Sequence, residues 1–230
     1  MTMTRRRALG TGIAAAAAAG LTPMSSLASA GSATRRFEVL RGGDPIGEHV
    51  TTVTSLGDSQ VQVGVTVKLA VKILGITAYR YEMQVEERWT DGRLDRLISE
   101  TNDDGTAERA DVRRENDVLI SSGTWTGQIA GPAATTTYWS PEFLDRPTWI
   151  STQSGEPLSV ALTRQGEEEI EGLGRRFTAQ RWRATGDLPV TLFFDDRNEW
   201  MGNAFDAGGT EARFRATSET GPLAPLWTAA

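Results

Sequence analysis

The sequence contains no cysteine and a single histidine, His49, among its 230 residues. Without a thiol no disulfide can form, and one imidazole cannot supply the usual Cys and His ligands of a zinc site. A lone histidine in a strand is more often a hydrogen-bonded structural residue than a catalyst. The composition therefore predicts no metal site and no cofactor, and leaves the role of His49 open.

Motifs of several enzyme classes are missing as well. There is no Gly-x-Ser-x-Gly elbow and no Ser-x-x-Lys, and Gly172-Leu173-Gly174 lacks the third glycine and the helix of a phosphate loop. Neighbouring acids such as Glu86 and Glu87 would point to opposite faces of a strand, so they cannot share a substrate. The stretch Glu100 to Asp111 resembles a calcium loop only superficially. No catalytic residue is assigned, although a carboxylate pair from distant strands stays open.

Positive charge is scarce, and long apolar runs are absent beyond the first thirty residues. The net charge is −6, and an acidic domain repels phosphate backbones, so nucleic acid is excluded as a partner. No basic amphipathic stretch indicates an anionic membrane surface. A transmembrane helix needs about 20 apolar residues, and residues 31–230 contain no such segment, so none is predicted in the mature chain.

The first thirty residues have the three parts of a twin-arginine signal peptide. Arg5, Arg6 and Arg7 precede a weakly apolar, alanine-rich stretch, and Ala28-Ser29-Ala30 forms a small-x-small cleavage site. The partners expected during export are the twin-arginine translocase and signal peptidase. The mature protein is expected in the periplasm or outside the cell. Loss of three arginines would change its net charge from −6 to −9.

Alternation of apolar and polar residues dominates what remains. Apolar residues occupy every second position from Val61 to Ile73, which is typical of a long strand with one buried face. Asp91-Gly92 and Asp104-Gly105 are strong two-residue hairpin signals, and such turns join antiparallel strands. Residues 31–230 are therefore predicted to form one all-β domain: a strongly curved antiparallel meander sheet or an incomplete β-barrel.

Two segments interrupt the strand pattern. Ile129 to Pro147 is rich in Thr, Ala and Pro, and is predicted to be a crossing loop or lid over the concave face. The tail from Gly221 to Ala230 contains two prolines and is expected to be loosely ordered.

Several motifs carry a resemblance over nearly all of the mature chain. They are Val71 to Thr77, Glu87 to Leu94, Thr101-Asn102, Tyr138-Trp139 and Thr152 to Gly155. In these the sequence resembles an uncharacterised bacterial family of exported β-rich domains of unknown function, which has no established activity to carry over and no catalytic residues to map. More distantly, the strand pattern is similar to the curved half-barrels of periplasmic carriers of lipids and lipoproteins of the LolA type, an analogy of fold alone.

These observations favour non-catalytic binding of a lipid or another hydrophobic or amphipathic small molecule in the cell envelope. A curled sheet with few helices must enclose either a packed core or an apolar cavity. The residues expected to line such a cavity are Val65, Val67, Tyr81, Trp89, Trp139 and His49. Two alternatives are an envelope hydrolase acting on glycan or lipid through His49 and a distant carboxylate, and a structural or interaction module.

Overall fold

The computed structural model describes residues 31–227, and the proposed signal peptide lies outside them. Apart from a 3-10 helix, η1 (Pro141–Asp145), and one helical turn, α1 (Ala224–Trp227), the regular elements are strands. The strands are β1 (Ser32–Arg41), β2 (Asp44–Gly57), β3 (Gln60–Ile73), β4 (Ile76–Thr90), β5 (Arg93–Asp103), β6 (Thr106–Glu115), β7 (Val118–Ser122), β8 (Thr126–Ala130), β9 (Ala133–Thr135), β10 (Thr148–Ile150), β11 (Pro157–Gly172), β12 (Arg175–Gly186), β13 (Val190–Phe194), β14 (Trp200–Asp206) and β15 (Glu211–Thr220).

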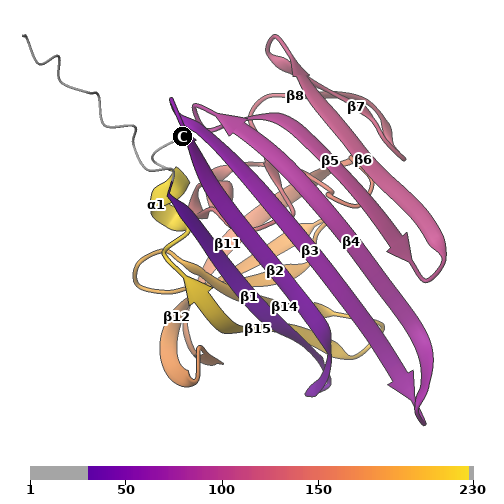
Figure 1. Cartoon of the computed structure of the whole chain (residues 1–230). Helices are drawn as coiled ribbons and strands as arrows, with labels where there is room; N and C mark the ends of the chain where they lie inside the picture. The colour runs from indigo at the N-terminus through magenta and orange to yellow at the C-terminus, as the bar shows by residue number, and fades with distance from the viewer. Residues whose placement is uncertain (1–30, 228–230) are drawn as a thin grey trace, which may run out of the picture.

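All the strands belong to one 15-stranded sheet. Its order is β8-β7-β6-β5-β4-β3-β2-β1-β15-β14-β13-β12-β11-β10-β9, so every neighbour except the β1–β15 pair is also a neighbour in the chain. All pairings are antiparallel apart from β9 with β10. The two edge strands, β8 and β9, follow one another in the chain, so the sheet is a nearly closed barrel (Figure 1). The all-β curved meander predicted from the alternation is confirmed.

The period-two pattern of β3 becomes the inner face of this barrel. Val61, Val63, Val65 and Val67 are all at most 4% exposed. In the β3–β4 register Val65 lies opposite Val85 and Val67 opposite Met83, so apolar side chains meet in cross-strand pairs. The alternation therefore determines which face of each strand is buried.

The predicted two-residue turns connect the strands as expected. Asp91 and Gly92 join β4 to β5 with φ of 48° and 67°, and Asp104 and Gly105 join β5 to β6 with φ of 49° and 95°. Positive φ at both central residues is the requirement of a type I′ hairpin turn, which Asp-Gly meets at low steric cost. Local turn chemistry thus sets the antiparallel order.

The segment expected to be a crossing loop or lid packs one side against the barrel interior, while Glu142, Asp145 and Pro147 stay exposed. Trp139 and Phe143 are fully buried, and Thr137 is 1% exposed. Both rings pack against Trp227, with centroids 5.3 Å and 5.5 Å away. Apolar side chains in this Thr- and Ala-rich stretch therefore fill one part of the barrel.

The tail also departs from the loose arrangement expected from its prolines. Leu223 is fully buried, and Trp227 is 8% exposed. The Glu199 carboxylate accepts hydrogen bonds from the backbone N–H groups of Leu223 and Ala224, each at 2.9 Å. Aromatic packing and these backbone bonds hold the chain end through Trp227 in place. Within residues 31–227 no helix is both long and apolar enough to cross a membrane.

Candidate functional site

The six residues expected to line a cavity do not form one site. Val65 and Val67 lie in the packed core, 3% and 4% exposed. Trp89 and Trp139 are fully buried around the same partners, Phe143 and Trp227. Aromatic rings of the barrel therefore occupy the space beside Trp89 and Trp139, whereas Val67 is among the residues that line a separate hollow of ≈610 Å³.

His49 lies in a second aromatic cluster. Its ring is 5.8 Å from that of Phe37, 5.5 Å from that of Trp200 and 5.1 Å from that of Phe214. Its Nε2 hydrogen-bonds to Thr51 Oγ1 at 2.9 Å. Burial lowers the pKa of His49 to about 3, because the apolar surroundings disfavour the imidazolium. A neutral ring without a carboxylate partner in the described residues is unsuited to the proton transfers of a hydrolase.

Tyr81 belongs to a polar network at one end of the inner face. Its hydroxyl donates to Gln153 Oε1 at 3.2 Å, and Gln153 Nε2 donates to Asp103 Oδ2 at 3.4 Å. Tyr79 donates to the other oxygen of Asp103 at 2.8 Å. Burial, chiefly, raises the pKa of Tyr81 to about 12, so the phenol stays protonated and acts as a donor. This network fixes the loop containing Gln153 against β4 and β5.

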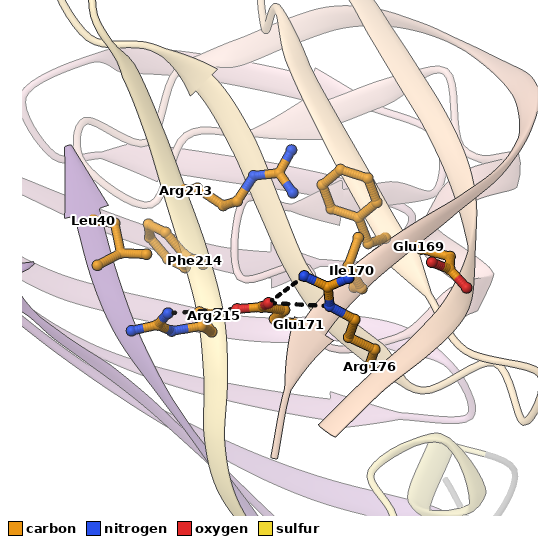
Figure 2. A pocket seen from close by; sticks show the side chains of 9 residues that line it. Leu40, Glu169, Ile170, Glu171, Arg176, Arg213, Phe214 and Arg215 are labelled. Carbon is orange, nitrogen blue, oxygen red and sulfur yellow. Dashed lines mark hydrogen bonds and ion pairs between the residues drawn. The ribbon is translucent and has the colours of Figure 1, made fainter. Parts of the chain in front are cut away.

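A different part of the sheet carries a hollow that we call the β11–β15 cavity. The β11–β12 hairpin curls back across β15, where the backbone N–H of Leu173 donates to the carbonyl of Ala216 at 2.6 Å. The hollow between them has a volume of ≈340 Å³. Its lining comes from β1, β11, β12, β13 and β15, as Figure 2 shows: Leu40, Glu169, Ile170, Glu171, Arg176, Phe193, Arg213, Phe214 and Arg215.

One part of this cavity is apolar and rigid. Ile170 is 6% exposed and Phe193 2% exposed, so both side chains are held by the fold. Leu40 and Phe214, both partly buried, complete this wall. Phe214 also contacts the His49 ring, which makes the His49 cluster the support beneath one side of the cavity.

Three arginines surround the apolar wall. The Arg213 guanidinium lies 5.1 Å from the centroid of the Phe193 ring, within the range of a cation–π contact. Arg176 pairs with Glu171 at 3.2 Å, and Arg215 approaches the other oxygen of Glu171 at 4.0 Å (Figure 2). The carboxylate therefore holds two guanidiniums side by side at the cavity.

Arg215 also pairs with Glu38, and Arg213 pairs with Glu168 and Glu211, but Arg176 and Arg215 each keep N–H groups for a further partner. An arginine has five N–H groups, and the Arg176 side chain is 74% exposed, so its pairing with Glu171 is weak and exchangeable. The ionisable side chains of the lining are Glu169, Glu171 and the three arginines. The arrangement is suited to binding an apolar group next to a hydrogen-bond-accepting one.

The family assignment follows from the extent of the sequence match. A family model described as "Domain of unknown function (DUF6134)" matches residues 37–217. The chain belongs to the DUF6134 family. The match spans β1 to most of β15, so the strands that build the β11–β15 cavity all lie in or overlap the DUF6134 region. The resemblance to a family of unknown function is confirmed in that respect.

A solved structure shares the architecture of this DUF6134 chain. It is the "Crystal Structure of Beta-barrel-like Protein of Domain of Unknown Function DUF1849 from Brucella abortus", with a TM-score of 0.59 and 10% sequence identity. The alignment covers 82% of this chain and 96% of that chain. At such low identity the likeness shows the barrel-like fold alone. No curated protein matches the sequence significantly.

Three acids are buried in the described residues, Glu87, Asp195 and Glu199, and sequence reasoning predicted the burial of none of them. Glu87 on β4 is 2% exposed, and its carboxylate accepts hydrogen bonds from Trp89 Nε1 at 2.8 Å and Thr137 Oγ1 at 3.2 Å. Burial raises its pKa to about 7, although these hydrogen bonds offset part of the shift. The signal was its place in the alternation, on the same face as Val85 and Trp89. Glu87 therefore couples β4 to the buried segment that contains Thr137.

Proposed function

We propose that this protein is exported and binds, without catalysis, a small amphipathic molecule in the β11–β15 cavity. The observation that carries the proposal is the apolar wall of Ile170 and Phe193 next to several arginines in one hollow. Its volume of ≈340 Å³ lies within the range of small-molecule sites. The ligand's apolar part would contact the wall, and its head group would accept hydrogen bonds from Arg176 and Arg215.

Export is supported by residues 1–30, where three arginines, an alanine-rich stretch and a small-residue cleavage site follow one another. The expected setting is the periplasm or the exterior of the cell, where lipids and their breakdown products supply molecules of this kind. The absence of cysteine fits a protein that needs no disulfide after export.

Titration calorimetry with decanoate, a fatty acid with one apolar chain and one carboxylate, tests the proposal. Micromolar to submillimolar binding is expected. Arg176→Gln should weaken it at least about fivefold, because a charge-assisted hydrogen bond is lost. Arg164→Gln is the matched control, since Arg164 lies on the neighbouring strand β11, is 51% exposed and does not line the cavity.

Two outcomes would count against the proposal. If decanoate does not bind and native mass spectrometry of protein purified from the cell envelope finds no co-purified small molecule, the structural or interaction module remains. If the two arginine variants weaken binding equally, the ligand lies elsewhere on the protein.

A further inference from the structure

The β3–β4 hairpin extends beyond the sheet. The last pair between β2 and β3 is Gly47 with Leu69, and the last between β4 and β5 is Tyr81 with Asp103. The β3–β4 pairing continues to Ile73 opposite Ile76. Beyond these limits the hairpin has no neighbouring strand, and it projects at the lower right of Figure 1. We call residues 70–80 the hairpin tip.

Two large apolar residues at this tip are exposed to solvent. Leu74 is 98% exposed and Ile76 is 74% exposed, whereas Leu56, the next among the residues whose burial the structure describes, is 44% exposed. Single exposed apolar side chains are normal, but these two lie two positions apart on one projecting turn. Together they form a small exposed apolar patch at the end of the β3–β4 hairpin.

The backbone at the turn gives a second, independent observation. Leu74 and Gly75 have φ of 51° and 82°, and positive φ is unfavourable for leucine but easy for asparagine or aspartate. The β4–β5 and β5–β6 turns have Asp91 and Asp104 at the equivalent position. Leucine at the tip therefore has a conformational cost in addition to its exposure.

A comparison inside the same chain shows what normally compensates this cost. Leu173, at the β11–β12 turn, also has positive φ, 53°. Its side chain is partly buried against the core, and its backbone N–H donates to Ala216. Leu74 has no such burial. Its apolar side chain is explained if the compensation comes from a surface outside the molecule.

The charge at the tip indicates what that surface is. The chain has two lysines, and Lys72 is at the tip while Lys68 lies just before it. Residues 69–81 contain Lys72 and Arg80 and no acid, in a chain of net charge −6. Three acids lie at the base of the tip: Asp103 is paired with Tyr81, Asp104 hydrogen-bonds to the backbone of Arg80, and Glu82 is opposite Lys68. Leu74 and Ile76 at the end of the hairpin would face the acyl chains of a bilayer, and the cations just behind them would face its anionic headgroups.

We propose that the hairpin tip inserts Leu74 and Ile76 into the surface of a phospholipid bilayer that contains anionic lipid, with Lys72 at headgroup level. A sequence search for basic amphipathic stretches misses such a device, because two apolar residues on a turn have no helical periodicity. The proposal stands on different residues from those of the β11–β15 cavity, and either can fail without the other.

Flotation of the full chain with phosphatidylcholine vesicles, with and without phosphatidylglycerol, tests the insertion. Leu74→Asn should weaken binding at least about tenfold, because most of the transfer free energy of a leucine is lost. Asparagine suits positive φ, so the fold should be unaffected. Lys72→Ser should weaken binding to the anionic vesicles about fivefold and leave the neutral ones unchanged, since one cation near an anionic surface is worth about that factor.

The matched control is Leu56→Asn, at the end of β2 that adjoins the start of β3 and lies far from the tip, which should leave binding unchanged. Residues 1–30 are common to all variants, so differences among variants report on the hairpin alone. If Leu56→Asn and Leu74→Asn weaken binding equally, or if neither does, the proposal is wrong.

A spectroscopic measurement gives the position of the tip directly. The chain has no cysteine, so Leu74→Cys and Leu56→Cys each provide one labelling site for a nitrobenzoxadiazole dye. With anionic vesicles the dye at position 74 should shift to the blue and brighten, and the dye at position 56 should not. A dye at position 74 that stays in water, or that changes with protein concentration in the absence of lipid, would overturn the proposal, the latter in favour of pairing between two copies of the chain.

Discussion

Arg35 and Glu199 form an ion pair inside the barrel, with Nη2 and Oε2 3.2 Å apart and side chains 0% and 1% exposed. Arg35 lies on β1, and Glu199 immediately precedes β14. The same carboxylate binds the backbone of Leu223 and Ala224. Burial lowers the pKa of Arg35, and Glu199 is the first of the carboxylates that oppose this effect. One acid therefore joins the first strand, the β13–β14 turn and the chain end.

Replacing this acid should destabilise the fold strongly. Glu199→Gln would leave the buried Arg35 guanidinium with one carboxylate partner, Glu219, whose side chain is 32% exposed, and with the Trp200 carbonyl oxygen. A loss of about 3–5 kcal/mol in the free energy of unfolding is expected, since that is the usual cost of an unpaired buried charge. Urea denaturation measures it. Glu219→Gln is the control and should cost at most about 1 kcal/mol; equal losses would mean that Glu199 is not the principal partner.

Glu87 should make stability depend on pH around neutrality. Its pKa is about 7 in the folded protein against an ordinary 4.5, so between these values the unfolded chain releases its proton first. The free energy of unfolding therefore falls as pH rises from about 4.5 to about 7. Relative to the wild type, Glu87→Gln should gain about 3 kcal/mol across that window. Denaturation at several pH values tests this, and a constant difference between the two proteins would contradict it.

His49 should make the folded protein less stable as the pH falls into the acid range. Its pKa is about 3 in the folded protein against 6.5 in the unfolded chain, so the unfolded chain takes up a proton first as pH falls. Its contribution to stability is complete above about pH 6.5 and is lost as pH falls toward 3. His49→Gln should reduce this acid sensitivity. Proton NMR of the imidazole offers a direct check: a folded-state titration near 6.5 would show that the ring is accessible to water.

Trp227 should contribute to stability in spite of its place near the chain end. Its ring lies 5.2 Å from that of Trp89, and the Arg146 guanidinium is 5.2 Å from its centroid. Trp227→Ala should cost about 3–5 kcal/mol, as for other large aromatic residues removed from a core. Thermal unfolding measures this against Pro222→Ala, at an exposed position. Equal melting temperatures for the two variants would support the loosely ordered tail expected from the sequence.

Export can be tested without the structure. Replacing Arg5, Arg6 and Arg7 by lysine should block the twin-arginine route, and the exported protein should begin at Gly31 after cleavage behind Ala30. Cell fractionation and N-terminal mass spectrometry give the answer. Unchanged export in a strain that lacks the translocase would refute the signal-peptide interpretation.

The sequence predicted which face of each strand is buried but not what packs against that face. The row from Val61 to Val67 was correctly placed on one face, because period-two alternation is a local property of a strand. Whether that face lines a cavity or a packed core depends on what is opposite it, and Trp139, Phe143 and Trp227 come from distant parts of the chain. Glu87 shares the inner face, yet its polarity hid it among the outward-facing acids Glu82 and Glu86.

By itself the sequence determined the strands, their buried faces and their turns, since alternation and the positive φ of Asp-Gly pairs act over a few residues. The tertiary structure decided the closure of the sheet, the burial of the segment around Trp139, and the cavity between β11 and β15. It also decided that the Leu74 side chain is exposed to solvent, whereas the side chain of Leu173, at a similar turn, is partly buried. These outcomes depend on the curvature of a 15-stranded sheet, which brings residues far apart in the chain into contact and leaves no periodic trace in the sequence.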